Sequence, residues 1–237
     1  MIKIVHLTKR FGETIAVSEL NLEIPRGELF CFIGPNGAGK TTTIKLLTGL
    51  LKPTSGEIFI GGYNIQTDHL KVKSLIGYIP DRPFLYEKLT GEEFLSFIAG
   101  LYGIKQADEK IGELLGLFGL SDYKERLIAN YSHGMRQRLV FSAVLLHQPE
   151  VIIIDEPLVG LDPASSRLVK NLLKKEATKG KTIFLSTHTL SVAEEIASRI
   201  GVIHQGRLIA LGGLEDLRKK AHRSGKLEEV FLQLTQD

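Results

Sequence analysis

Residues 34–42 have the sequence GPNGAGKTT, which contains the spacing G-x-x-x-x-G-K-T. An apolar run at residues 29–33 precedes this segment, and a helix-like run begins after it at Ile44. This order predicts a strand, a glycine loop and the N-terminus of a helix. The glycines Gly34, Gly37 and Gly39 permit positive φ angles that turn backbone N–H groups toward a phosphate, and the helix N-terminus adds partial positive charge. An ordinary glycine-rich turn is the alternative, but the flanking pattern favours phosphate binding.

Two side chains of this loop have a predicted chemical role. Lys40 supplies a full positive charge for the β- and γ-phosphates of a nucleotide, and the Thr41 hydroxyl is a natural Mg²⁺ ligand. We expect ATP to contact the whole loop, which consists of Gly34, Pro35, Asn36, Gly37, Ala38, Gly39, Lys40, Thr41 and Thr42. The segment therefore predicts a nucleotide-binding protein.

Composition limits the class of protein. The 237 residues, 43% of them hydrophobic, suffice for one large domain with a buried core. The net charge is +3 and the basic residues form no long block, so no nucleic-acid partner is expected. The single cysteine, Cys31, is expected to be a small core residue in a reducing cytoplasm. No apolar run approaches the ~18 to 20 residues that span a bilayer, so any membrane role is expected to come through a partner.

The hydrophobic pattern predicts an α/β core with an inserted helical subdomain. Between about residues 82 and 148, apolar residues recur at helical spacing without a strong strand. The run at 151–154 is apolar on both faces, as a buried parallel strand requires. Residues 9–13 are expected to form a polar turn, and the helix after the glycine loop to end near Leu50. Other strands are predicted at 2–5, 20–24, 28–33, 57–60, 75–79, 182–185, 199–204 and 207–211, and other helices at 163–177, 190–197, 214–220 and 226–234.

Two adjacent acidic residues, Asp155 and Glu156, end the most hydrophobic predicted strand. A carboxylate at that position is costly unless a positive group meets it, and in a phosphate-loop protein Mg²⁺ does so. Asp155 would hold the metal directly or through water, and Glu156 would orient and deprotonate a water near the γ-phosphate. The alternative is a solvated pair at a strand end.

Two further segments have weaker local signals. His188 follows another apolar strand and can reach the same edge of the sheet, although a histidine there is more often structural. Ser132 suits the N-cap of a basic helix whose first N–H groups can face an anion. On local grounds alone, an ordinary capped helix is the better interpretation of Ser132.

Taken together, these segments resemble the nucleotide-binding domain of ATP-binding cassette (ABC) transporters over nearly the whole chain. Residues 34–42 are similar to the family's Walker A loop, 151–157 to its Walker B strand, 159–162 to its D-loop and 131–138 (YSHGMRQR) to its signature. His188 falls at the switch histidine, and Phe11 falls where the family stacks an aromatic ring on adenine.

The resemblance implies a P-loop NTPase core, in which helices flank a mixed sheet, with an antiparallel β subdomain and an inserted α-helical subdomain. Residues 1–81 and 149–237 would form the core. Residues 82–148 would form the helical subdomain that contains the signature, and about 213–237 a short helical tail.

The resemblance also implies partners. Two cassettes would pack head to tail around two ATP molecules, so that Ser132 and Gly134 contact the ATP held by the other chain. A homodimer and a heterodimer both remain open, and an isologous interface follows if the chains are equal. A separate membrane permease would dock near residues 80–90, which places the subunit at the cytoplasmic face of the membrane.

Two residues depart from the family pattern. Asp81 stands where the family usually has a glutamine that ligates Mg²⁺ and water, and a carboxylate there adds repulsion near the phosphates. His133 replaces the first glycine of the signature. Similar variants are familiar among cassettes of antibiotic and multidrug exporters, which favours export over import.

The leading hypothesis is therefore an ATPase that powers a membrane transporter, with Glu156 and His188 as its catalytic residues. One alternative is a soluble cassette protein acting on ribosomes or DNA, but such chains usually carry two cassettes or a long insertion. Another is a cassette that binds ATP as a switch without hydrolysis, which Asp81 and His133 suggest and the intact Lys40 opposes.

Overall fold

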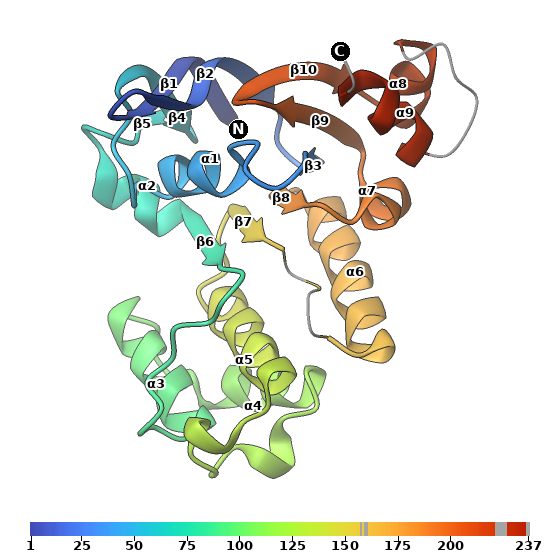
Figure 1. Cartoon of the computed structure of the whole chain (residues 1–237). Coiled ribbons are helices and arrows are strands. Elements are labelled where there is room, and N and C mark those ends of the chain that lie inside the picture. The colour runs from blue at the N-terminus through green and yellow to red at the C-terminus, as the bar shows by residue number, and fades with distance from the viewer. Residues whose placement is uncertain (157, 159–160, 221–226, 236–237) are drawn as a thin grey trace.

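The structure is a computed structural model that describes residues 1–156, 158, 161–220 and 227–235. Its centre is a six-stranded sheet in the order β10-β9-β3-β8-β7-β6 (Figure 1). Five of these strands are parallel, and β10 runs antiparallel to β9. The strands are β3 (Leu29–Ile33), β6 (Ile76–Ile79), β7 (Val151–Asp155), β8 (Thr182–Thr187), β9 (Arg199–His204) and β10 (Arg207–Gly212).

A second, antiparallel sheet has the order β2-β1-β4-β5 and lies beside the first at the top of Figure 1. Its strands are β1 (Ile2–Phe11), β2 (Thr14–Ile24), β4 (Ser55–Ile60) and β5 (Tyr63–Asn64). The prediction of a polar turn at residues 9–13 was wrong, because residues 9–11 pair with β2 and only two residues connect the strands. The pairing is non-local, which a local polarity pattern does not show.

The two faces of the central sheet contribute to two hydrophobic clusters. Phe30, Phe32 and Phe184 face the antiparallel sheet and α1 (Lys40–Leu47), with ring centroids 5.4–6.3 Å apart. Cys31 and Ile33, on the opposite face, pack in the cluster that includes residues of α5 (His133–Leu146), α6 (Pro163–Thr178) and α7 (Leu190–Ile196). Strand β3 is therefore buried on both sides, as a central parallel strand requires. Cys31 is the core residue that its sequence predicted, and burial raises the pKa of its thiol.

The segment between β6 and β7 is helical, as predicted, and forms no strand between residues 82 and 148, all of which the structure describes. It contains α3 (Gly91–Leu101), α4 (Asp108–Leu117) and α5, with short 3₁₀ turns at 121–123 and 128–130. Helix α3 begins at a capping box, in which Thr90 accepts from the Glu93 N–H and the Glu93 carboxylate accepts from the Thr90 N–H. These helices lie together at the bottom of Figure 1.

The remaining helices are α2 (His69–Leu75), α8 (Leu214–Lys220) and α9 (Leu227–Thr235). The two C-terminal helices were predicted, whereas α2 and β5 were missed because both are short and α2 buries only Val72. Helix α1 ends at Leu47 and not near Leu50, since Gly49 takes φ +71° after it. No helix among the described residues is long and apolar enough to cross a membrane.

Candidate nucleotide site

The glycine loop connects β3 to α1 across residues 34–39. Gly39 is the N-cap of α1 and has φ +107°. A Cβ at this position would lie 2.4 Å from the carbonyl oxygen of Ala16, so both the backbone angle and the neighbouring strand require glycine. Ala16 also lines the candidate site, a contact that no sequence signal indicated.

Gly34 was also expected to need a positive φ angle, and it does not have one. Its φ is not positive, unlike those of Gly37 and Gly39, so the predicted reason for glycine was wrong there. A Cβ on Gly34 would lie 2.4 Å from the carbonyl oxygen of Ile203, on strand β9. The close approach of the two backbones is what excludes a side chain.

Lys40, the first residue of α1, folds back over this loop. Its Nζ donates to the carbonyl oxygens of Gly34, at 2.7 Å, and Pro35, at 3.1 Å, and the residue is 7% exposed. Burial lowers the pKa of Lys40, and the negative charges of Glu156 and Asp155 oppose that effect. The ammonium group is therefore already placed at the centre of the loop, where a phosphate would neutralise it.

A cavity of about 440 Å³ brings together most of the predicted site residues of one chain. It lies at the carboxyl edge of the central sheet, where β3, β6, β7 and β8 end, as expected for a ligand site in a parallel sheet. Its size is in the range of small-molecule and cofactor sites. The lining residues are Ala16, Asn36, Gly37, Gly39, Lys40, Thr41, Thr42, Asp81, Glu156 and His188.

Glu156 and His188 are in direct contact in this cavity. The Glu156 Oε1 accepts from the His188 backbone N–H at 2.9 Å and lies 2.8 Å from its Nδ1, while the Thr187 hydroxyl donates to Oε2 at 3.2 Å. Glu156 itself has φ +48°, a sparsely populated angle for a side chain of this size. Such strain is often found at functional sites, and here it aims the carboxylate away from the strand.

Asp155 lies behind the cavity rather than in its wall. It is 3% exposed, and one of its carboxylate oxygens accepts from the hydroxyl of Ser186, its register partner on β8. Burial raises the pKa of the nearby Tyr78 to about 12, and the negative charges of Asp155 and Asp81 add to this effect. The hydroxyls of Ser186 and Thr187 were not assigned a role from the sequence, although they directly precede His188.

Several predicted residues do not line this cavity. Gly34, Pro35 and Ala38 belong to the loop whose other residues line it, and Asp155 lies behind it, whereas three more residues lie apart. Phe11 ends β1 and is 47% exposed, with the Nζ of Lys9 5.0 Å from its ring centroid. Ser132 is the N-cap of α5, where its hydroxyl accepts from the N–H of Met135 at 3.3 Å, and Gly134 lies in the first turn. The structure thus brings the loop, strand-end acids and His188 together, and leaves the signature segment apart on the helical segment.

The donors at the site fit Mg²⁺. The Thr41 hydroxyl and the Asp81 carboxylate are exposed in the cavity wall, and the Asp155 carboxylate lies behind it. Hydroxyl and carboxylate oxygens are the ligands that Mg²⁺ prefers, with substrate phosphates completing its shell. Among the described residues no group of three or more His, Cys, Asp or Glu side chains could hold a metal alone, in keeping with a metal held jointly with a nucleotide.

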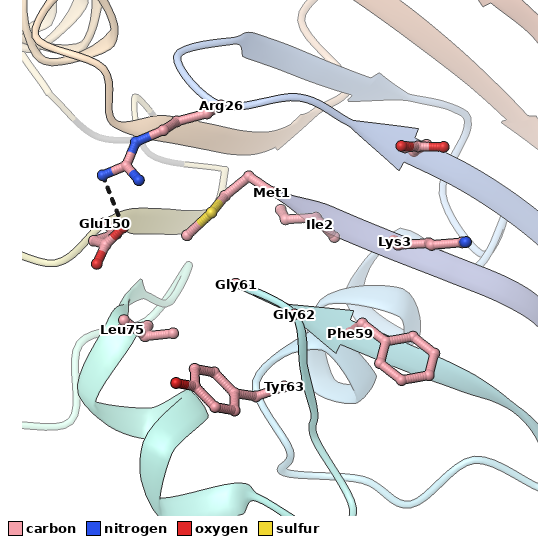
Figure 2. Close-up of a pocket in the computed structure, with 11 residues that line it drawn as sticks. Met1, Ile2, Lys3, Arg26, Phe59, Gly61, Gly62, Tyr63, Leu75 and Glu150 are labelled. Atoms are coloured by element: carbon pink, nitrogen blue, oxygen red, sulfur yellow. Dashed lines mark ion pairs between the residues drawn. The ribbon is translucent and has the colours of Figure 1, made fainter.

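A larger cavity of about 730 Å³ lies at the other end of the central strands, near the residues that precede β3, β6 and β7. Figure 2 shows the Arg26 guanidinium reaching the Glu150 carboxylate across it, at 2.9 Å. Met1, Phe59 and Tyr63 contribute to its wall. None of its described lining residues is a predicted site residue.

A glycine loop at the carboxyl edge of a parallel sheet, with a lysine inside it and a strand-end glutamate opposite, defines a P-loop NTPase. A family model described as ABC transporter matches residues 17–159. The chain belongs to the ABC transporter family. It is an ATP-binding subunit that hydrolyses ATP for transport.

Individual relatives agree with this. The chain is 39% identical over 221 residues to the bacitracin transport ATP-binding protein BcrA of Bacillus licheniformis, covering 93% of this chain and 72% of the relative. It is 36% identical to the linearmycin resistance ATP-binding protein LnrL of Bacillus subtilis, covering 92% and 70%. It is 35% identical to the probable multidrug ABC transporter ATP-binding protein YbhF of Escherichia coli, of whose length it spans 42%.

Solved structures show the same fold. The ATP-binding subunit of an ABC transporter superposes with a TM-score of 0.94 at 34% identity, covering 99% of both chains. A dimeric ATP-binding cassette in a post-hydrolysis state with ADP and phosphate superposes with a TM-score of 0.81 at 27% identity, covering 90% of this chain and 99% of that one. The predicted fold, of a P-loop core with an antiparallel sheet and an inserted helical segment, is confirmed.

Proposed function

We propose that ATP binds in the 440 Å³ cavity with its phosphates on residues 34–42, its adenine near Phe11 and its γ-phosphate toward Glu156. The convergence of Lys40, Glu156 and His188 on one cavity is the observation that supports this assignment. Lys40 would exchange its two carbonyl partners for the β- and γ-phosphates. Thr41, Asp155 and Asp81 would hold Mg²⁺, which supplies charge neutralisation at the phosphates.

In this proposal Glu156 accepts a proton from the attacking water. Its carboxylate is oriented by the Thr187 hydroxyl and the His188 N–H, which leaves its position fixed before substrate arrives. His188 is half exposed, so its ring can reach both this carboxylate and the γ-phosphate. The pair would order the water for in-line attack, and Lys40 would stabilise the negative charge that develops.

The working unit is proposed to be a dimer of cassettes. Ser132 and Gly134 do not line the cavity of their own chain, and they occupy the N-terminus of α5, where backbone N–H groups can bind an anion. A second cassette, equal or different, would bring this segment to the γ-phosphate. A solved relative is itself dimeric with ADP and phosphate, which supports this assembly.

A separate permease is proposed to dock on the apolar groove between α3, α5 and the central sheet, which has a volume of about 660 Å³. Phe84, at its edge, is 91% exposed, and Tyr102 is 45% exposed. Asp81 lines the nucleotide cavity and lies three residues before Phe84, so one short segment connects the two sites. With the permease on this groove, residues 82–148, the proposed helical subdomain, would lie between nucleotide and permease.

We further propose that the transporter is an exporter, because relatives over nearly the whole chain are named for bacitracin transport and linearmycin resistance. The subunit would then lie peripherally at the cytoplasmic face of the membrane. The test is a transport assay in liposomes that contain the permease with the purified subunit bound to it. The nucleotide sites of the subunit face the solution outside the liposomes. Uptake of a peptide antibiotic into the lumen that requires ATP and stops in Lys40→Ala supports export. ATP-driven movement of cargo out of the lumen, or no ATP hydrolysis at all, contradicts it.

A further inference from the structure

Two neighbouring surface cavities flank the end of α1 and the helix α2. The permease groove described above contains Lys45, Leu50 and Lys73 in its wall, and a second cavity of about 520 Å³ contains Lys52 and His69. They share Thr48 and Lys73, so they adjoin. Figure 1 shows α1 and α2 next to each other on one side of the molecule. The lysine ridge is defined here as Lys45, Leu50, Lys52, His69, Leu70 and Lys73.

The lysine ridge has an uncompensated positive charge. None of the described residues that line the two cavities is acidic. Lys45, Lys52 and Lys73 are exposed, and none of them forms an ion pair with another residue in the part of the chain that the structure describes. The nearby carboxylate of Asp68 lies 3.7 Å from Lys71 and is engaged there. Elsewhere several lysines are paired, as in the contact of Lys124 with Glu92 at 3.0 Å.

Two leucines project from the same surface. Leu50 is 61% exposed and Leu70 is 72% exposed, whereas Val72 on the same helix is wholly buried. Residues two apart on a helix point in nearly opposite directions, so Leu70 faces away from the body of the protein. Exposed leucines among lysines are the pattern of a surface that lies in the headgroup region of a bilayer.

We propose that the lysine ridge contacts anionic phospholipid headgroups beside the permease. This inference rests on the proposed docking groove, with the permease over the part of the groove near Phe84 and Tyr102. The exposed Lys45, Leu50 and Lys73, which line the same groove, would then be left beside the permease and toward the bilayer. An acidic protein segment could also pair with the lysines. Leu70, however, lies outside both cavities and projects, which suits insertion into a soft lipid surface more than binding in a protein pocket. Each lysine near such a surface strengthens binding about fivefold, so the contact orients the subunit rather than anchoring it alone.

Sedimentation with vesicles tests the proposal without permease or ATP, so its result does not depend on the catalytic roles proposed above. Wild type should bind phosphatidylglycerol-containing vesicles at low salt and not pure phosphatidylcholine. Replacing Lys45, Lys52 and Lys73 by Glu should weaken that binding by roughly a hundredfold or more. The matched control replaces Lys174, Lys175 and Lys219 by Glu and should retain most binding. It changes net charge equally on α6 and α8, which lie on the other side of Figure 1 from α1 and α2.

A fluorescent reporter locates the contact. The chain contains no tryptophan, so Leu70→Trp gives a single reporter on the lysine ridge and Leu117→Trp, on α4, gives a control with an exposed parent residue. Anionic vesicles should shift the emission of the first to shorter wavelength and leave the second unchanged. Equal loss of binding in both lysine triples, no shift at position 70, or binding of wild type to neither vesicle overturns the proposal. In that last case, loss of permease assembly in the Lys45, Lys52 and Lys73 variant would assign the ridge to the permease.

Discussion

The carboxylate of Glu156 and the imidazole of His188 meet at 2.8 Å, although they are 32 positions apart in the chain. The register of β7 and β8 creates this contact, because Asp155 pairs with Ser186 and the two strands then end together. Glu156 turns out of its strand with φ +48°, and the backbone N–H of His188 holds its carboxylate. The two side chains that are proposed to act on the water are therefore prepositioned by backbone geometry.

Glu156→Gln should leave ATP binding intact and reduce hydrolysis by about 10²–10⁴-fold, because the amide keeps the shape of the side chain and cannot accept the proton. We expect ATP-bound dimers of this variant to accumulate in gel filtration. Glu150→Gln, at the other end of the same strand, is the matched control and should hydrolyse ATP normally. Wild-type turnover in Glu156→Gln would show that another group is the base.

His188→Ala should lower kcat by about 10²-fold with little change in ATP affinity, since the ring is proposed to act on the water and γ-phosphate and not on the adenine. Phosphate release and equilibrium binding of a fluorescent ATP analogue would measure the two effects separately. His69→Ala, an exposed histidine outside the cavity, should have neither effect. A large loss of affinity with unchanged kcat would assign His188 to binding instead.

Gly39→Ala should weaken ATP binding because its φ of +107° is unfavourable for alanine and the new Cβ would meet the Ala16 carbonyl oxygen. Strain of about 1–3 kcal/mol corresponds to a roughly five- to 150-fold loss of affinity. Gly37→Ala has a φ of +79° but open space around the new Cβ, so its loss should be smaller. Titration calorimetry would compare the ATP affinities of the two variants. Equal losses of affinity would exclude the contact with the Ala16 carbonyl oxygen as the cause.

Mixing two inactive variants tests whether Ser132 acts on the partner's nucleotide. In a dimer of one Lys40→Ala chain and one Ser132→Ala chain, one site keeps both an intact Lys40 and the partner's intact Ser132. If chains exchange freely, an equal mixture should recover about a quarter of wild-type hydrolysis, well above either variant alone. Ser132 acting within its own chain gives no recovery.

Glu176→Gln should lower the free energy of unfolding at neutral pH. It should also make that free energy less dependent on pH in the acidic range. Glu176 is buried, and Lys179 and Lys181 both contact its carboxylate at 2.7 Å. Burial by itself raises the pKa of Glu176, but the two lysines outweigh it and hold the pKa below the ordinary 4.5. The ionised carboxylate therefore stabilises the fold above pH 4.5, and this contribution is lost as the pH falls through the lowered pKa.

We expect a loss of about 1–3 kcal/mol in the free energy of unfolding for Glu176→Gln at pH 7, measured with urea, and a smaller loss near pH 3. Glu215→Gln removes a highly exposed partner of Arg218 and should change stability little at either pH. Equal destabilisation of Glu176→Gln at pH 7 and pH 3 would show that the ion pairs are not its source.

The motifs predicted the site because their chemistry is local. The spacing around Lys40 encodes a loop whatever surrounds it, and the apolar run before Asp155 encodes a buried strand end. The conformation of a residue that contacts a segment distant in the sequence could not be predicted in the same way. Gly34 looked like a residue needing positive φ, but strand β9 excludes its side chain, and residues 9–11 looked like a turn but pair with β2.

The lysine ridge is another feature that the local sequence does not show, because it combines segments that are distant in the chain. Its lysines are scattered from 45 to 73, and the net charge of +3 gave no sign of a basic surface. Only the folded chain brings the end of α1 and helix α2 to the same two cavities, whose described lining residues include no acidic side chain. The expectation that any membrane role comes through a partner stays a prediction, to which the lysine ridge adds a proposed contact by the chain itself.

The amino-acid sequence alone determined the glycine loop, the acidic strand end, the helical insertion and the family, because each depends on residue types at short and fixed spacing. The tertiary structure decided that Lys40, Glu156 and His188 share one cavity, that Asp155 bonds Ser186 behind it, and that Ser132 lies outside it. These relationships arise from strand order and register, which bring Lys40 to the same cavity as Glu156 and His188 although it lies far from both in the chain.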